Sequence, residues 1–247
     1  MPGQDDSFRV GSVTAEAMAV GLAPVGRETV QDRVYGELRR ALIGGLFAPG
    51  QVLTIRQLSD ALMTSTMPVR EALGRLISEQ ALEALPSRQI RVPPITLDRL
   101  TDLLRARTLI EGEAIALAAP RLTAEGLERA ATIMAEWEAL RLGGNPETVD
   151  REVMLNQAFH FEIYRACGSA VLIPMIESLW LQSGPCTRAA IFAFSEAGEK
   201  DASRYHHAIL DALRRGDAAA ARVALIDDIS RPFAFLRSKL DRPEETP

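Results

Sequence analysis

Apolar side chains recur at helical spacing near the start of the chain, across residues 29–44. Four of them follow one another at intervals of four residues and so share one face of a helix: Val30, Val34, Leu38 and Leu42. The Gly44-Gly45 pair ends the pattern, because glycine is common just past a helix C-terminus. This segment is therefore predicted to form an amphipathic helix.

Two shorter helices are predicted next, over residues 55–62 and 65–80. Thr54 and Gln57 have the spacing of a capping box at the start of the first helix. Ser65 can cap the second, and Pro68 fits its first turn, where a missing backbone N–H removes no helical hydrogen bond. Two short capped helices joined by a tight turn are typical of a helix-turn-helix.

Two short strands, at residues 82–85 and 90–92, are predicted to flank a turn. Three helices followed by such a hairpin form a winged helix-turn-helix. Arg70 lies on the early, outward part of the recognition helix, which would meet the major groove. The hairpin carries arginines placed to contact phosphate or the minor groove. The predicted DNA-contacting residues are Arg56, Ser65, Thr66, Arg70, Arg88 and Arg91.

The stiff pair Pro93-Pro94 marks a predicted domain boundary, and only helical periodicity follows it. The predicted helices cover residues 97–118, 123–142, 149–167, 170–182, 187–194, 199–215 and 217–240. Pro174 is expected to kink or restart one of them, and Pro232 to bend the last. The expected fold is mainly α: an N-terminal winged helix-turn-helix with a small β-hairpin, then an all-α antiparallel bundle.

The resulting division has four parts. Residues 1–26, rich in small residues, are expected to form a mobile arm, and residues 27–95 a DNA-binding domain. Residues 96–240 are expected to form an all-helical domain for effector binding and dimerisation, and residues 241–247 a tail.

Charge supports this division. The chain has 247 residues, 47% of them apolar, which is enough for a full core. Its net charge of −5 argues at first against a nucleic-acid partner. However, residues 27–95 hold nine arginines and seven carboxylates, whereas residues 96–247 hold 18 basic and 23 acidic side chains. The basic excess falls on the segment predicted to bind DNA.

Membrane insertion and disulfide bonding are not expected. No run of 18 apolar residues occurs, and residues 1–26 lack the basic and apolar blocks of a signal peptide. Cys167 and Cys186 lack a CxxC partner and are expected to be packed thiols of a reducing, cytoplasmic protein.

Polar side chains that can bind metal fall on the inward faces of the predicted bundle helices. Asn156 and His160 are four residues apart and share a face. His206 lies in the stripe that contains Ile209, and Asp228 lies in the apolar stripe of the last helix. Two imidazoles and a carboxylate suit a first-row divalent ion, although such groups also occur as simple hydrogen-bonded core residues.

Two stretches carry a resemblance to the GntR family of bacterial transcription regulators, in its FadR-like branch with an FCD effector domain. Residues 46–53 and the Pro68-Val69-Arg70-Glu71-Ala72-Leu73 stretch of the recognition helix resemble the DNA-binding domain. Four patterns in residues 96–240 resemble the FCD domain: Arg107 with Glu111, Phe159-His160, residues 206–210, and Gly216-Asp217.

The resemblance implies a divalent metal ion (zinc, nickel, manganese or iron) held by a carboxylate and three histidines. By position these ligands fall on Asn156, His160, His206 and Asp228. Asn156 stands where the family has Asp, and Asp228 where it has His, so nitrogen and oxygen donors are kept. The resemblance also implies a small organic-acid effector, for which Arg107 is the candidate anchor. An ion pair between Arg107 and Glu111 is the alternative.

The DNA side departs from the family at three positions. Thr66 stands where the family usually has arginine, Gln89 replaces a wing glycine, and Met63 replaces a turn glycine. Thr66 cannot make a bidentate contact with guanine, so the operator is expected to differ from the commonest family sequence.

The sequence thus predicts a non-enzymatic, effector-controlled transcription regulator that binds double-stranded operator DNA as a homodimer. Three alternatives stay open. The bundle could be a metal-free sensor of a larger acyl ligand, or only a dimerisation platform. It could also be a metal-dependent enzyme that uses His160, His206 and Asp228 as a facial triad.

Overall fold

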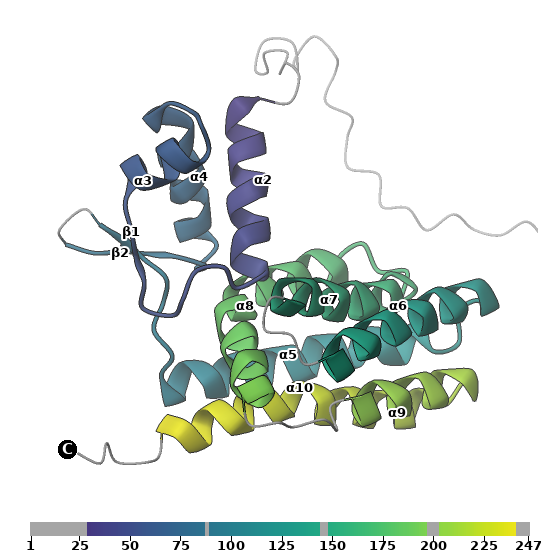
Figure 1. Ribbon diagram of the computed structural model, residues 1–247. Coiled ribbons are helices and arrows are strands. Elements are labelled where there is room, and N and C mark those ends of the chain that lie inside the picture. Colours follow the sequence, from purple (N-terminus) through teal and green to yellow (C-terminus); the bar gives the residue numbers. More distant parts are fainter. Residues whose placement is uncertain (1–28, 87–88, 144–147, 197–202, 241–247) are drawn as a thin grey trace, which may run out of the picture.

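The computed structural model describes residues 29–86, 89–143, 148–196 and 203–240. In this described part, three helices and a small sheet lie above a layer formed by the six helices that follow them in the chain (Figure 1). The predicted arm, the tail, Arg88 and the start of the helix expected at residue 199 lie outside the described residues. The mainly α fold, with a winged helix-turn-helix before an all-helical part, is confirmed.

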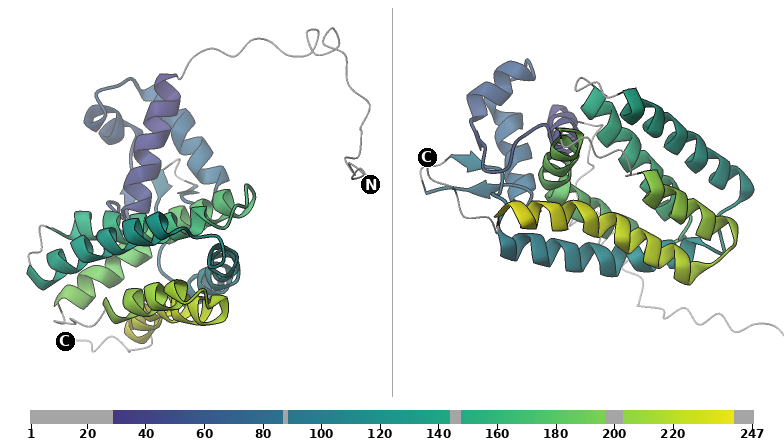
Figure 2. Two further views of the ribbon diagram at one scale, coloured as in Figure 1. Left: turned by 90° about the vertical axis from the view of Figure 1, so that its right-hand side faces the viewer. Right: turned by 60° about the horizontal axis from the view of Figure 1, so that its bottom comes forward.

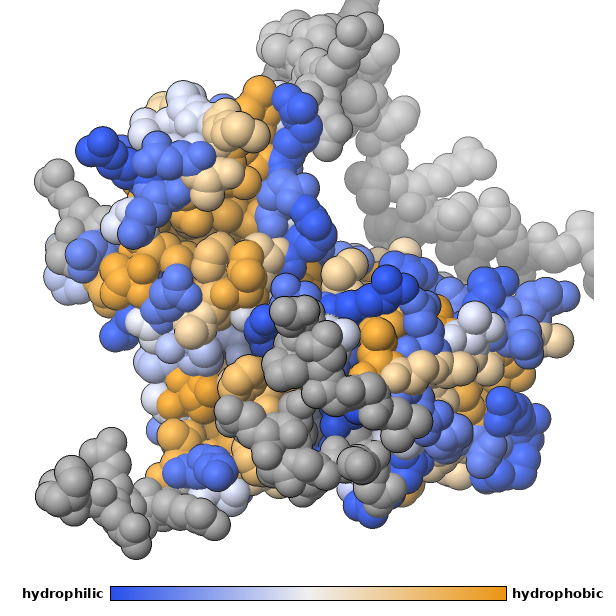
Figure 3. Space-filling model, in the orientation of Figure 1, coloured by the Kyte–Doolittle hydropathy of each residue, from blue (hydrophilic) through white to orange (hydrophobic). Residues whose placement is uncertain are grey.

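The first described helix, α2 (Val30–Ile43), forms as predicted. Thr29 and Asp32 complete a capping box, in which the Thr29 side chain accepts from the Asp32 N–H at 3.2 Å. One side of α2 is hydrophilic, and the side turned toward the next two helices is hydrophobic (Figure 3). Leu38 and Leu42 on that side are buried, whereas Val30, at the free end of the stripe, is exposed.

The helix-turn-helix consists of α3 (Ile55–Ala61) and α4 (Thr66–Ser78). Thr54 caps α3 as predicted, by accepting from the Gln57 N–H at 3.3 Å. Ser65 occupies the N-cap position of α4, but its side chain makes no capping hydrogen bond, so that predicted contact is wrong. Met63 in the turn has a φ of 49°, a conformation that glycine would adopt without strain.

The wing is a three-stranded antiparallel sheet of β1 (Val52–Leu53), β2 (Glu83–Ala84) and β3 (Ile90–Arg91), in the order β1-β3-β2. The sequence predicted only the two hairpin strands. Strand β1 has two residues, which is too short to show the alternation that identifies a strand. Val52 pairs with Arg91, which ties the hairpin to the segment that precedes α3.

The helical part contains α5 (Leu97–Ala118), α6 (Ala124–Gly143), α7 (Val149–Arg165), α8 (Leu172–Glu196), α9 (Ser203–Arg214) and α10 (Ala218–Leu240). Helix α10 runs antiparallel to α5 along its length (Figures 1 and 2). The core between the helices includes the fully buried side chains of Phe159, Ile163, Tyr164, Ile209 and Leu225. Among the residues that the structure describes, no helix is long and apolar enough to cross a membrane.

Helix α8 corrects a prediction. The sequence predicted two helices, over residues 170–182 and 187–194, but α8 continues through Pro185. Proline removes one hydrogen bond from a helix interior and favours a break. Here Leu181 and Cys186 on either side of it are buried, so packing keeps the helix continuous. Cys186 is a packed thiol as predicted, and burial raises its pKa to about 11.

Helix α8 also joins the two parts of the molecule. Glu177 pairs with Arg39 of α2 at 3.0 Å. About two turns later, Gly184 packs directly on the C-terminal end of α2. A Cβ at Gly184 would lie 2.2 Å from the Leu42 carbonyl oxygen and 2.6 Å from that of Ile43, so only glycine fits there without movement.

Candidate metal centre and nucleic-acid interface

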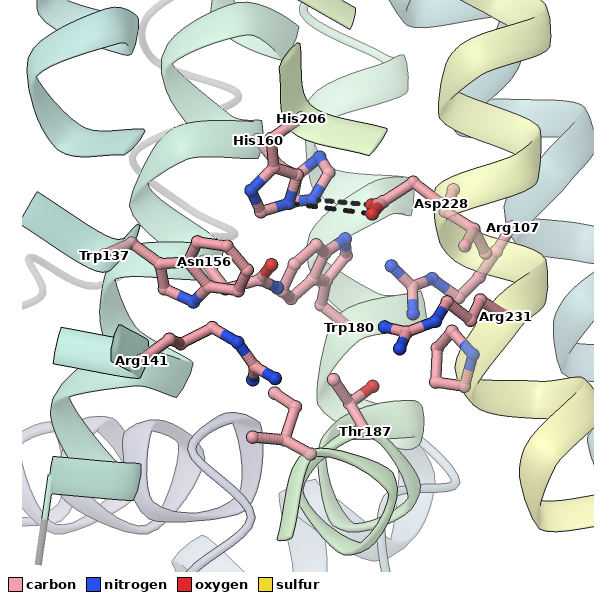
Figure 4. A pocket seen from close by; sticks show the side chains of 13 residues that line it. Arg107, Trp137, Arg141, Asn156, His160, Trp180, Thr187, His206, Asp228 and Arg231 are labelled. Carbon is pink, nitrogen blue, oxygen red and sulfur yellow. Dashed lines mark ion pairs between the residues drawn. The ribbon is translucent and has the colours of Figure 1, made fainter. Parts of the chain in front are cut away.

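Three of the predicted metal-binding side chains meet inside the helical part, from three different helices. His160 comes from α7, His206 from α9 and Asp228 from α10 (Figure 4). The His160 Nε2 lies 3.2 Å from one Asp228 oxygen, and the His206 Nε2 lies 3.6 Å from the other. The three donor atoms all lie within 4.8 Å of one another.

This spacing fits a single divalent ion. Imidazole nitrogens and carboxylate oxygens bind zinc at about 2.1 Å, which puts neighbouring ligands of a tetrahedral site about 3.4 Å apart. The two nitrogen–oxygen distances, 3.2 and 3.6 Å, lie on either side of that value. Three ligands leave coordination positions open for a bound molecule.

The two imidazoles are held by aromatic neighbours. The His206 ring packs against both Phe159 and Trp137, with centroid distances of 4.4 and 4.6 Å. Burial lowers the pKa of His206 to about 4, although the nearby Asp228 carboxylate pulls it upward. The imidazole is therefore neutral at neutral pH, and a neutral imidazole is the form that binds metal.

Asp228 supplies the negative charge of the cluster. Burial of its carboxyl group raises the pKa, but the His206 and His160 imidazoles and the Arg107 guanidinium outweigh that effect. The pKa of Asp228 is consequently lowered, so the carboxylate is ionised and able to bind a cation.

Asn156 is the fourth predicted ligand. It precedes His160 by one turn of α7 and lines the same cavity, with its amide beneath the imidazoles in Figure 4. A neutral amide oxygen is a weaker ligand than a carboxylate, so its role as a ligand stays a prediction.

Arg107 lies in the cavity wall, but much of its guanidinium is already engaged. Its Nε and Nη2 donate to the two Glu111 oxygens at 2.5 and 3.2 Å, and its Nη1 lies 3.4 Å from the Ser183 hydroxyl. Tyr164 and Trp180 donate to the same Glu111 carboxylate. The ion pair that the sequence offered as an alternative is therefore present. A role in effector binding stays a prediction.

The remaining wall of the cavity was not predicted. It includes side chains from α6, α8 and α10: Trp137, Arg141, Trp180, Thr187, Ile191 and Arg231. No sequence spacing relates helices so far apart in the chain. The only signal was composition, because Trp137 and Trp180 are the two tryptophans of the chain.

The predicted DNA-contacting residues lie on the other part of the molecule. Arg56 on α3 is exposed, as are Ser65, Thr66 and Arg70 at the start of α4. Arg91 is half-buried and pairs with Glu83 of the neighbouring strand at 2.6 Å, which stabilises the wing. Arg88 lies outside the described residues. The exposed residues at the start of α4 lie where a recognition helix contacts base edges. Contacts of all these side chains with DNA stay a prediction.

A winged helix-turn-helix joined to an all-helical part with a buried histidine–aspartate cluster defines a class of bacterial DNA-binding regulators. The family model for bacterial regulatory proteins of the gntR family matches residues 30–92, and the FCD domain model matches residues 102–231. The chain therefore belongs to the GntR family, with an FCD domain, and is a transcription regulator of that type.

Relatives and solved structures agree with this assignment. The chain is 29% identical over 210 residues to the HTH-type transcriptional regulator McbR of Escherichia coli (strain K12), covering 85% of this chain and 94% of McbR. It is 29% identical over 150 residues to the HTH-type transcriptional repressor GlaR of the same organism, covering 59% and 67%. The solved structure of E. coli McbR/YncC superposes with a TM-score of 0.79 and 27% identity, covering 87% and 100%.

Proposed function

We propose that this regulator binds its operator as a homodimer, under the control of a small organic acid bound with a divalent metal ion in the helical part. The observation that carries the proposal is the convergence of His160, His206 and Asp228, from three helices, on one buried cavity. In this proposal residues 27–95 read DNA and residues 96–240 bind the effector and dimerise.

The donor set supports a metal. Two imidazoles and an ionised carboxylate are ligands for zinc, nickel, manganese or iron, and Asn156 would add a weak fourth. A bound ion would supply a Lewis-acidic centre with open positions for an effector carboxylate. His206 Nδ1 is buried and has no hydrogen-bond partner among the described residues, so aromatic packing, and not a hydrogen bond at Nδ1, orients this ring.

The size of the cavity favours a small effector over a long acyl chain. About 60 Å³ is open to the centre of a water-sized sphere. A single buried water needs about 10–15 Å³ by this measure, so the space corresponds to about four to six water positions. That volume suits an acid of a few carbon atoms. The names of the relatives, which are transcription regulators, favour sensing over catalysis.

The proposal is tested on protein purified without chelator. Elemental analysis should find about one divalent ion per chain, and a thermal-shift screen of small carboxylic acids should find compounds that raise the melting temperature. Those acids should change operator affinity, and removal of the metal should abolish their effect. Effector binding that survives complete metal removal would instead support the metal-free sensor. Absence of metal together with no response to any acid would refute the proposal.

A further inference from the structure

The two imidazoles of the cluster differ in what lies beside their Nδ1 atoms. The His206 Nδ1 has no hydrogen-bond partner among the described residues, and aromatic neighbours hold its ring. The His160 Nδ1, in contrast, lies 3.5 Å from the Tyr164 hydroxyl, at the long end of hydrogen-bond range. One predicted ligand is thus oriented by packing alone, and the other also has a polar partner behind it.

The Tyr164 hydroxyl donates its single proton away from His160. The acceptor is a Glu111 oxygen at 2.6 Å. Both Glu111 oxygens also accept from Arg107, as an ionised carboxylate does, so Glu111 has no proton to give. Burial and the adjacent Glu111 charge raise the pKa of Tyr164 well above its ordinary value, so the phenol keeps its proton. Toward His160 the hydroxyl oxygen therefore offers only lone pairs.

This direction of donation determines where the His160 ring carries its proton. Only a proton on Nδ1 completes a hydrogen bond with an oxygen that accepts. The lone pair that binds a metal ion is then on Nε2, which is the atom 3.2 Å from Asp228. Metal-binding histidines generally donate their second ring N–H to an oxygen acceptor, which fixes the tautomer and the orientation of the ring. Here the acceptor is a phenol that is itself bonded to a carboxylate.

The groups behind His160 are held rigidly by three helices. His160 and Tyr164 are four residues apart on α7, with ring centroids 5.8 Å apart and ring planes inclined by 24°. Tyr164 and Glu111 are both fully buried. Trp180 of α8 donates at 3.0 Å to the same Glu111 oxygen that accepts from Tyr164. Helices α5, α7 and α8 thus fix the hydroxyl that orients His160.

We infer that Tyr164 and Glu111 are positioning residues for the metal ligand His160. The His160 Nδ1–H donates to the Tyr164 oxygen, and the Tyr164 O–H donates to Glu111. The inference rests on the proposed function, because it requires a metal ion at the cluster, and it assigns two residues of that site beyond the ligands. A purely structural role would predict a loss of stability with no specific effect on the metal.

The first test measures zinc affinity by competition with a chromophoric chelator. Tyr164→Phe removes one oxygen atom and keeps the ring. Loss of a hydrogen-bond partner behind a metal ligand usually weakens metal binding about 10–100-fold, so zinc should bind to this variant at least about tenfold more weakly. Unchanged zinc affinity in Tyr164→Phe would overturn the inference.

Tyr35 provides a matched control in the DNA-reading part. Its hydroxyl donates to Glu79 at the same distance, 2.6 Å. Tyr35→Phe therefore loses a comparable bond between a phenol and a carboxylate. Its zinc affinity should stay within about twofold of the unsubstituted protein, because distant sites usually act independently. Equal weakening of zinc binding in the two variants would reflect a general loss of stability and would overturn the inference.

The second test detects the proton itself and does not depend on a variant that folds. The chain has three histidines, so proton–nitrogen correlation spectra of the zinc-loaded protein can resolve each ring. His160 should bind zinc through Nε2 and carry a proton on Nδ1. In Tyr164→Phe the Nδ1–H signal of His160 should move, and that of His206 should not. Zinc bound to His160 through Nδ1 would overturn the inference, as would equal movement of both signals.

Failure of the positioning residues and failure of the metal site give different results. Unsubstituted protein that binds no zinc would refute the proposed function, and the inference with it. Unsubstituted protein that binds one zinc ion, together with equally tight binding by Tyr164→Phe, would refute only the roles of Tyr164 and Glu111.

Discussion

Arginine has opposite uses in the two parts of this molecule. On α3 and α4 the guanidinium groups of Arg56 and Arg70 are exposed, where they can reach phosphate or base edges. In the helical part Arg107 is 4% exposed and shares a buried carboxylate with two aromatic donors. Sequence alone does not separate the two uses, because each arginine lies in an amphipathic helix. An arginine is available for a ligand when its guanidinium is exposed and no carboxylate already pairs with it.

The largest effect should come from removing the shared carboxylate. Glu111 is fully buried and accepts hydrogen bonds from Arg107, Tyr164 and Trp180. Glu111→Ala leaves a buried guanidinium unpaired and should lower the free energy of unfolding by about 3–5 kcal/mol. Denaturant unfolding measures this change.

Glu113 provides the control on the same helix. It is exposed and pairs with Arg222 at 3.4 Å, so Glu113→Ala should cost less than about 1 kcal/mol. Similar losses for the two variants would remove the distinction between the buried and the exposed arginines.

Metal removal should have the next largest effect. Ligand at a hundred times its dissociation constant stabilises a folded protein by about 2.7 kcal/mol, so a strong chelator should lower the melting temperature. His160→Ala should abolish this response. Asn156→Asp should tighten metal binding if the Asn156 amide oxygen is a ligand, because a carboxylate is a stronger ligand than a neutral amide. An unchanged melting curve after verified removal of the metal would refute the site.

Loss of one exposed arginine should have a smaller effect on DNA binding. If Arg70 contacts phosphate, Arg70→Ala should flatten the salt dependence of operator binding by about one unit of slope. If it reads a base, discrimination at one position should fall by about 1–3 kcal/mol. Arg215→Ala, an exposed arginine of the helical part, is the control. Wild-type affinity in Arg70→Ala would remove this residue from the interface.

The smallest effect should come from the linker. Effector and operator binding are expected to be coupled by about 1–3 kcal/mol, reciprocally. Replacing Pro93-Pro94 by Gly-Gly should reduce the coupling only in part, because α8 also contacts α2 through Glu177 and Gly184. Titration of effector against operator binding in both proteins measures the difference. Complete loss of coupling in the Gly-Gly variant would show that the α8 contact transmits nothing.

Local signals predicted the DNA-reading part almost completely. The capping pair at Thr54, the proline at the start of α4 and the apolar spacing of α2 act within a few residues, so sequence reveals them. Two features that depend on three-dimensional geometry were not predicted correctly. Ser65 sits at the N-cap without capping, and the two-residue strand β1 left no pattern to detect.

The cavity was predicted only where helical spacing or a family pattern marked it. His160, His206 and Asp228 lie together as predicted, but Trp137 and Thr187, which also line the cavity, were not predicted, because no sequence spacing relates α6 and α8 to the other helices. Continuity of α8 through Pro185 was also missed. The rule that proline breaks a helix considers the helix alone, whereas here the burial of Leu181 and Cys186 of α8 outweighs the lost hydrogen bond.

The glycine contact between α8 and α2 has a consequence for engineering. The two-part architecture suggests chimeric proteins, in which the DNA-binding part of one regulator is fused to the effector-binding part of another. Because Gly184 meets the carbonyls of Leu42 and Ile43 at distances that exclude a side chain, the two parts cannot be exchanged independently. A functional hybrid would have to carry α8 along with α2, or keep a glycine at the matching position of the incoming sensor.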